Sequence, residues 1–228
     1  VSALEDKTFS IPIDDIISGK HDAEFTASPG NIPNFGFTKS AYWVRFTLGN
    51  SSYRIMNKFV EIGFPLLDNV EIYSFTSEEG VSPLMAGKET TGREIPFNER
   101  LFKHRNFLFP VELAPYTEKN FYLRIKTDDG MIFPLTVWEP SYFNSKTQQE
   151  LFAFGVYYGI IIIMILYNLF IYVSTRDNNY LYYILYIAAF GMFQLAMNGI
   201  AYQFLWPASP WWAVHANPFL IGMRNGLA

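Results

Sequence analysis

Two side chains suited to recognising a polar ring, Trp43 and Arg45, lie two residues apart in the segment Ala41–Asn50. An indole face stacks on the C–H surface of a sugar, and a guanidinium offers several hydrogen-bond donors in a fixed geometry. Apolar and polar residues alternate along this segment, so a strand would place both side chains opposite its apolar face. The structural alternative is that Trp43 packs in the core and Arg45 pairs with an acid such as Glu61 or Glu71.

A second pair of polar residues, His104 and Arg105, would extend this candidate ligand site if their strand lies beside that of Trp43. A metal site is not expected, because no carboxylate lies at ligand spacing from His104 and the chain has no cysteine. Asp68 is expected to be a turn residue whose side chain bonds its own backbone.

The sequence carries no Ser-His-Asp signature, no phosphate-binding loop and no HExxH motif. Its paired acids, Asp14-Asp15 and Asp128-Asp129, are typical of helix caps and turns. A glycosidase would need two carboxylates that converge on one substrate, and the sequence does not place two carboxylates in this way. We therefore expect neither an enzyme nor a cofactor, and a membrane-anchored enzyme ranks last among the function classes.

Two long runs without charged residues, Leu151–Val173 and Tyr180–Trp206, follow the residues that could bind a ligand. About 20 apolar residues cross a bilayer core as a helix, so each run predicts a membrane span. Trp211–Ala228 is expected to begin a third span, and an arginine at position 224 would then be an unusual charge at membrane depth.

Small and polar residues within these runs indicate helix packing. Gly155 and Gly159 form a GxxxG pattern, which allows two helix backbones to approach closely. Asn168 must find a hydrogen-bond partner, because an unpaired amide in hydrocarbon is costly. We favour packing within one helix bundle, and a homodimer contact is the alternative.

Charge divides the chain into two parts. All but two of the 17 basic residues and all but one of the 21 acidic residues lie in residues 1–150. The acidic N-terminal part has no basic patch, which argues against a nucleic-acid partner. We expect a polar domain over residues 1–145, a short polar linker over Pro140–Gln149, and membrane helices over residues 146–228.

The N-terminal part is expected to be all-β. Short β-rich runs are separated by Pro, Gly, Asn and Asp, which favours an antiparallel sandwich. These runs are Ala41–Asn50, Lys58–Phe64, Val70–Phe75, Asn106–Leu113, Asn120–Lys126 and Met131–Trp138. Ile13–Ser18 predicts one helical turn, and Pro29–Phe35 and Glu78–Arg100 are expected to be weakly ordered.

The orientation of the chain across the membrane is predicted from the loop after the first span, Ser174–Asn179, which contains Arg176. The loop after the second span contains no basic residue, so the positive-inside rule places Ser174–Asn179 in the cytoplasm. The N-terminal domain would then lie outside the membrane.

The chain resembles the bacterial seven-transmembrane receptors with diverse intracellular signalling modules, and its N-terminal part resembles their second type of extracellular sensing domain. The resemblance covers nearly the whole chain. The stretches that carry it are YWVRF at Tyr42–Phe46, EIGFPLLDNVEIY at Glu61–Tyr73, HRNF at His104–Phe107, FYLRI at Phe121–Ile125, YYG at Tyr157–Gly159, YNLF at Tyr167–Phe170 and DNNYLYY at Asp177–Tyr183.

This resemblance implies a jelly-roll-like periplasmic β-sandwich, seven helices in the bacterial inner membrane, and a cytoplasmic output module such as a cyclase, kinase or phosphatase. It also implies a small, carbohydrate-like ligand. The chain departs from the family pattern in having two full spans, part of a third, and no output module. We expect a receptor whose sandwich senses a small ligand; the alternative is a membrane-anchored module that binds another protein.

Overall fold

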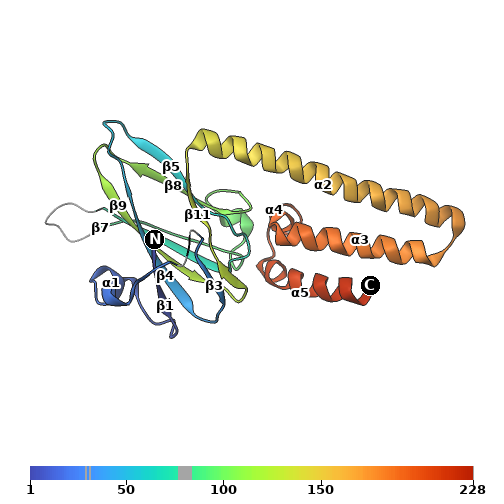
Figure 1. Ribbon diagram of the computed structural model, residues 1–228, viewed down its shortest axis with the longest axis horizontal. Coiled ribbons are helices and arrows are strands. Elements are labelled where there is room, and N and C mark those ends of the chain that lie inside the picture. The colour runs from blue at the N-terminus through green and yellow to red at the C-terminus, as the bar shows by residue number, and fades with distance from the viewer. Residues whose placement is uncertain (29, 31, 77–83, 228) are drawn as a thin grey trace. The chain divides into compact units, whose positions relative to one another are not determined.

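The N-terminal unit, Val1–Glu139, is built mainly from antiparallel strands, and the C-terminal unit, Pro140–Ala228, from helices (Figure 1). The computed structural model describes residues 1–28, 30, 32–76 and 84–227. The strands are β1 Ser2–Asp6, β2 Thr26–Ala27, β3 Asn34–Phe37, β4 Ala41–Gly49, β5 Met56–Ile62, β6 Asn69–Thr76, β7 Leu84–Thr91, β8 Phe107–Leu113, β9 Glu118–Lys126, β10 Gly130–Ile132 and β11 Leu135–Trp138.

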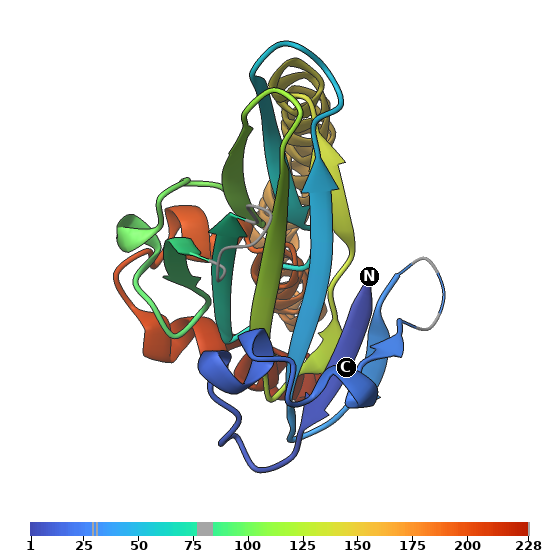
Figure 2. The same ribbon diagram turned by 90° about the vertical axis from the view of Figure 1, so that its left-hand side faces the viewer.

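The strands form a six-stranded sheet in the order β2-β1-β4-β9-β6-β7, a three-stranded sheet in the order β11-β5-β8, and the pair β10-β3. Figure 2 shows them running side by side through the N-terminal unit. Side chains of both larger sheets meet in one core, with Val44, Ile72 and Leu123 from the first sheet and Val60 and Phe109 from the second. The predicted antiparallel sandwich is confirmed.

Two predictions about single segments need correction, and a third is confirmed. Strand β7 lies within Glu78–Arg100, a segment predicted to be weakly ordered. Of the two segments predicted to be weakly ordered, Pro29, Asn31 and residues 78–83 lie outside the described part. The run Met131–Trp138 is two strands, β10 and β11, which pair with β3 and β5. Pro134 stands between them and has no N–H to continue a ladder. The helical turn is present as α1, Ile13–Ile17.

The helices of the C-terminal unit are α2 Pro140–Thr175, α3 Asn178–Met197, α4 Ile200–Phe204 and α5 Pro210–Leu227. Both α2 and α3 are long and apolar enough to cross a membrane. The segment Pro140–Gln149, predicted to be a linker, is instead helical and forms the first part of α2. The second predicted span is interrupted, because Gly199 adopts a left-handed backbone with φ of 73° and ends α3.

Packing between α2 and α3 involves Gly191, which lies outside the predicted GxxxG pattern. A Cβ built on Gly191 would lie 3.1 Å from Ile161, whereas nothing lies within 4 Å of one built on Gly155 or Gly159. Asn168 donates to the carbonyl of Met164 at 2.8 Å, one turn earlier in its own helix. The helix-packing role of the GxxxG pattern therefore stays a prediction, and the side chain of the arginine at position 224 lies outside the described residues.

Asn198 joins α2 to the end of α3. Its side-chain amide donates to the hydroxyl of Tyr158 at 3.0 Å. A polar pair between helices satisfies two groups that hydrocarbon cannot. This hydrogen bond therefore stabilises the packing of α2 against the end of α3.

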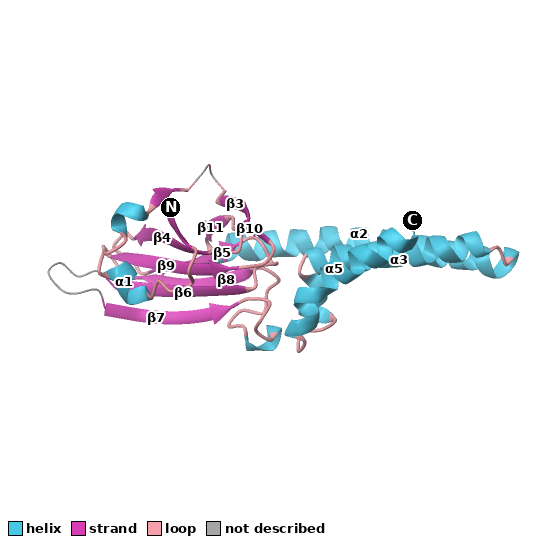
Figure 3. Ribbon diagram, turned by 90° about the horizontal axis from the view of Figure 1, so that it is seen from below, coloured by secondary structure: helices cyan, strands magenta, loops and turns pink. Residues whose placement is uncertain are grey.

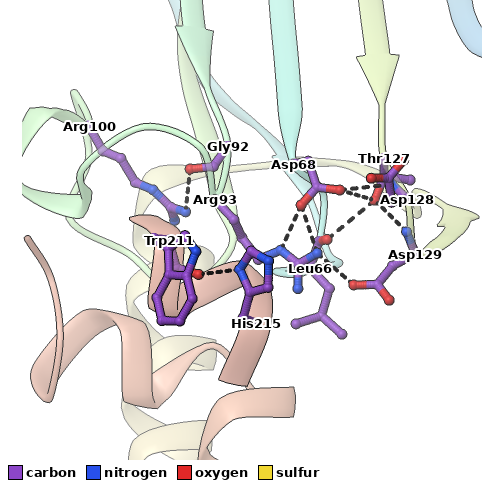
Figure 4. A network of polar contacts seen from close by, with 10 residues as sticks. All are labelled: Leu66, Asp68, Gly92, Arg93, Arg100, Thr127, Asp128, Asp129, Trp211 and His215. Atoms are coloured by element: carbon purple, nitrogen blue, oxygen red, sulfur yellow. Dashed lines mark hydrogen bonds and ion pairs between the residues drawn. The ribbon is translucent and has the colours of Figure 1, made fainter. Parts of the chain in front are cut away.

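A cluster of charged residues, Arg93 with Asp68 and Asp129, lies at one end of the strands of the N-terminal unit. Arg93 donates to Asp68 at 2.7 and 3.1 Å and to Asp129 at 2.6 Å. Asp68 also accepts from the Thr127 hydroxyl at 3.0 Å and from the Asp128 N–H at 2.8 Å (Figure 4). The expectation that Asp68 bonds its own turn is wrong: its carboxylate gathers two segments distant in sequence.

Gly92 allows this cluster to form. Its φ is 148°, and a Cβ at this position would lie 1.9 Å from the carbonyl oxygen of Asp68. Arg100 donates to the Gly92 carbonyl at 3.2 Å, so the same residue also anchors the following loop (Figure 4). No L side chain fits here without moving the backbone.

We predict that Gly92→Ala lowers the free energy of unfolding of the 1–139 domain by about 3 kcal/mol or more, because both the backbone angle and the space forbid a Cβ. Chemical denaturation followed by fluorescence measures this. Gly87→Ala is the matched control, since its Cβ would meet the Ser74 hydroxyl at an ordinary 3.4 Å. Equal effects of the two changes would contradict the prediction.

Candidate functional site

Trp43 does not lie on an open surface. Its side chain is 1% exposed, and it packs against Leu4, Ile16 and Tyr73 on the outer face of the six-stranded sheet. The indole N–H donates to the Ile11 carbonyl at 3.2 Å. The expectation of an exposed indole is therefore wrong, because the segment containing α1 covers this part of the strand face.

His104 and Arg105 are not brought to Trp43. They lie just before β8, which belongs to the three-stranded sheet, whereas Trp43 lies on β4 of the six-stranded sheet. The carbonyls of His104 and Arg105 accept from Arg100 at 3.2 and 3.4 Å. Their strand is therefore not a neighbour of β4, and the condition for a shared site with Trp43 is not met.

Arg45 keeps part of its side chain exposed, at 35%. It forms an ion pair with Asp22, donates from Nε to the Ser2 hydroxyl at 3.1 Å, and lies 4.2 Å from the centre of the Phe25 ring. The acid that pairs with it is thus neither Glu61 nor Glu71. These contacts fix the plane of the guanidinium at the edge of a cavity.

This cavity, called here the Arg45 cavity, has a volume of about 380 Å³. It lies along neighbouring parts of β4 and β9, which pair residue by residue from Tyr42 to Gly49. Its lining residues are Val1, Ser2, Ala27, Arg45, Phe46, Thr47, Asn120, Phe121 and Tyr122. The volume lies within the range of small-molecule sites.

The polar groups of the Arg45 cavity come from cross-strand neighbours. The Thr47 hydroxyl donates to the Asn120 side-chain oxygen at 2.6 Å. Burial is the main cause that raises the pKa of Tyr122, while nearby Arg45 lowers it and Asp22 raises it. The phenol therefore stays protonated at neutral pH and can both donate and accept.

Sequence reasoning found Arg45 but missed Thr47, Asn120 and Tyr122. Thr47 could have been found, because it lies two residues after Arg45 and hence on the same strand face. Asn120 and Tyr122 could not, because only the pairing of β4 with β9 brings them beside Arg45. The arrangement offers a cation, a hydroxyl, an amide and an aromatic ring around one opening.

A second cavity, called here the Glu89 cavity, opens between the two larger sheets and has a volume of about 210 Å³. Its lining residues are Ile72, Ser74, Gly87, Lys88, Glu89, Leu101, Phe109, Pro110, Val111 and Phe121. Burial raises the pKa of Glu89 from 4.5 to about 6. Within the described ranges, no group of three or more His, Asp or Glu side chains is placed to hold a metal ion.

We predict that Glu89→Gln stabilises the 1–139 domain at pH 7.5. The raised pKa means that ionised Glu89 costs stability, a cost that appears as pH rises from 4.5 to about 6. The rise in the pKa from 4.5 to about 6 corresponds to about 2 kcal/mol, which solvent screening at this partly buried carboxyl reduces to about 1 kcal/mol. Urea unfolding at pH 7.5 and pH 4.5 should show the gain at the higher pH and none at the lower; a gain of the same size at both would contradict it.

An antiparallel β domain with a cavity on its sheet, followed by two helices long and apolar enough to cross a membrane, is the pattern of a membrane protein with a folded N-terminal domain. Residues 1–139 match the family model described as 7TMR-DISM extracellular 2, and residues 150–224 match the model described as 7TM diverse intracellular signalling. The chain belongs to the 7TMR-DISM family. No curated protein matches it.

Membership makes the chain part of a transmembrane signalling receptor whose extracellular sensor domain is the N-terminal unit. The two matched models describe a sensor and a membrane domain, and neither is catalytic.

Proposed function

We propose that the extracellular domain binds a small, hydroxylated, carbohydrate-like ligand in the Arg45 cavity. The observation that carries the proposal is the convergence of Arg45, Thr47, Asn120 and Tyr122 on one opening of about 380 Å³. A fixed guanidinium, a hydroxyl and an amide match the hydroxyl groups of a sugar, and a phenol ring offers a stacking face. In this proposal Trp43 is a positioning residue that holds the segment around α1 against the sheet.

Ligand binding would reach the membrane through β11 and α2. A single residue, Glu139, separates Trp138 at the end of β11 from Pro140 at the start of α2. The Trp138 indole donates to Glu61 of β5 at 2.7 Å, and Lys58 of the same strand forms an ion pair with Glu139. These contacts hold the last two residues before the helix, Trp138 and Glu139, on the three-stranded sheet.

The buried carboxylate of Glu61 is the centre of this attachment. It is 2% exposed and also accepts from the Asn106 amide at 2.6 Å. A ligand can shift the helix bundle only if it binds two states of the receptor with different affinity. In our proposal the two states differ in how β11 lies against β5, and a cytoplasmic output module responds to the resulting movement of α2. The receptor would lie in the bacterial inner membrane, with the sensor in the periplasm.

The alternative function is an interaction module, and one surface feature favours it. Asn50 joins the loops that follow β4 and β8 by donating to the Arg54, Leu113 and Ala114 carbonyls. These loops expose Tyr53 at 68% and Tyr116 at 73%. Exposed aromatic side chains gathered at one end of a domain are a feature of protein-binding surfaces, including those of homodimers.

We predict that a sugar or sugar-acid ligand raises the melting temperature of the 1–139 domain, and that Thr47→Val weakens its binding about tenfold through loss of a hydrogen bond. Calorimetric titration measures the affinity. Thr90→Val is the matched control, since Thr90 is an exposed threonine on β7 that does not line the Arg45 cavity.

A broad screen of sugars, glycan fragments and small acids without any melting shift would refute the small-ligand proposal. An equal loss of affinity in Thr90→Val would place the ligand elsewhere. A concentration-dependent dimer without a ligand effect would support the interaction module instead.

We also predict that Trp138→Phe loosens the attachment of α2 without changing ligand affinity. The change keeps the ring but removes the N–H that Glu61 accepts. Hydrogen exchange in the full chain should become faster in residues 135–142 and remain unchanged in β4 and β9. Unchanged exchange at the start of α2 would argue against this route of transmission.

A further inference from the structure

The Glu89 cavity lies on the opposite side of the six-stranded sheet from the Arg45 cavity and shares only Phe121 with it among the lining residues. Three of its lining residues, Gly87, Lys88 and Glu89, belong to β7. Strand β7 is the edge strand of the six-stranded sheet and lies next to β6 (Figure 3). Its walls are mainly apolar and come from both sheets, with Ile72 and Phe121 on one side and Phe109 and Val111 on the other. A site between two sheets with apolar walls suits a ligand that has an apolar body.

Glu89 faces into this space. It pairs directly with Ile72 across β6 and β7, and Ile72 points into the core between the sheets. Residues opposite each other in an antiparallel pair lie on the same face, so the Glu89 carboxyl points the same way. Among the described residues, no hydrogen bond or ion pair satisfies that carboxyl.

The neighbouring cation is directed away from Glu89. Lys88 lies next to it in the chain and therefore on the opposite face of β7. The Lys88 ammonium lies 5.1 Å from the centre of the Tyr73 ring and 3.9 Å from Glu71. The negative charge of Glu89 in its cavity is thus not balanced by this lysine.

An inward-pointing charge on an edge strand has a known structural use, since it discourages pairing with another sheet. That use requires a charge at the edge but no cavity around it. Here the carboxyl lies at an opening of about 210 Å³, and burial raises its pKa to about 6. Burial makes ionisation of the Glu89 carboxyl unfavourable. A cationic ligand would offset this free-energy cost by pairing with the carboxylate.

We propose that the Glu89 cavity is a second ligand site that takes a small organic cation, a primary ammonium group on a short apolar body. The ammonium donates to the Glu89 carboxylate, and the apolar body contacts Phe109 and Val111. A divalent metal ion fits poorly, because within the described residues no group of three or more His, Asp or Glu side chains could hold one. The volume equals about seven waters at about 30 Å³ each, which matches a body of a few carbons. This site does not depend on the ligand proposed for the Arg45 cavity.

The test uses the full chain in detergent micelles and two pairs of probes of matched shape: n-butylammonium with n-butanol, and cyclohexylammonium with cyclohexanol. Saturation-transfer NMR titrations give the affinities at pH 7.5. At least one ammonium should bind about tenfold more tightly than its alcohol, because a charge-assisted hydrogen bond replaces a neutral one. Glu89→Gln should abolish the difference.

Glu71→Gln is the matched control, because Glu71 lies on β6 with its carboxyl near Lys88, on the other face of the sheet. It should leave the preference for the ammonium unchanged. Thr47→Val should also leave it unchanged, which separates this site from the Arg45 cavity. The proposal is overturned if neither ammonium binds, if each binds no better than its alcohol, or if Glu89→Gln binds the ammonium as tightly as the unaltered chain.

Discussion

The burial of strand β4 on both faces is the constraint on which the extracellular domain depends. Val44 points into the core shared by the two larger sheets, and Trp43 points into a smaller core under the segment that contains α1. The large indole fixes that segment because it is fully buried and hydrogen-bonded to Ile11. The segment that contains α1 covers this face of β4 only as far as Arg45. The Arg45 cavity lies beyond it, along β4 and its neighbour β9.

The same domain uses buried charges to fix its connections. At one end of its strands, Asp68 and Arg93 join the segment before β6 to the turns that follow β7 and β9. On the other large sheet, Glu61 holds Trp138 at the point where the β domain becomes helix. Buried charges must be paired to be tolerated, so these contacts define one arrangement of the chain rather than several. A receptor needs such defined connections if a small change at a ligand site is to reach the membrane.

Local patterns in the sequence are sufficient to predict the fold class and the family. Alternation along Ala41–Gly49 predicts β4, and runs of uncharged residues predict α2 and α3 because length and hydropathy decide whether a helix can span a bilayer. Strand β7 was missed because its glycine and charged residues look like a loop, and it is held as a strand by pairing with β6. The ending of α3 at Gly199 was missed because hydropathy does not detect a left-handed residue.

For the candidate site, the sequence determined that Arg45 and Thr47 share a strand face, since the period of a strand is a local property. It also determined that Trp43 lies on that face. Only the tertiary structure decided that Trp43 is covered, that His104 and Arg105 belong to the other sheet, and that Asn120 and Tyr122 lie beside Arg45. The physical reason is that burial and cross-strand pairing are set by segments far apart in the chain, which no local pattern records.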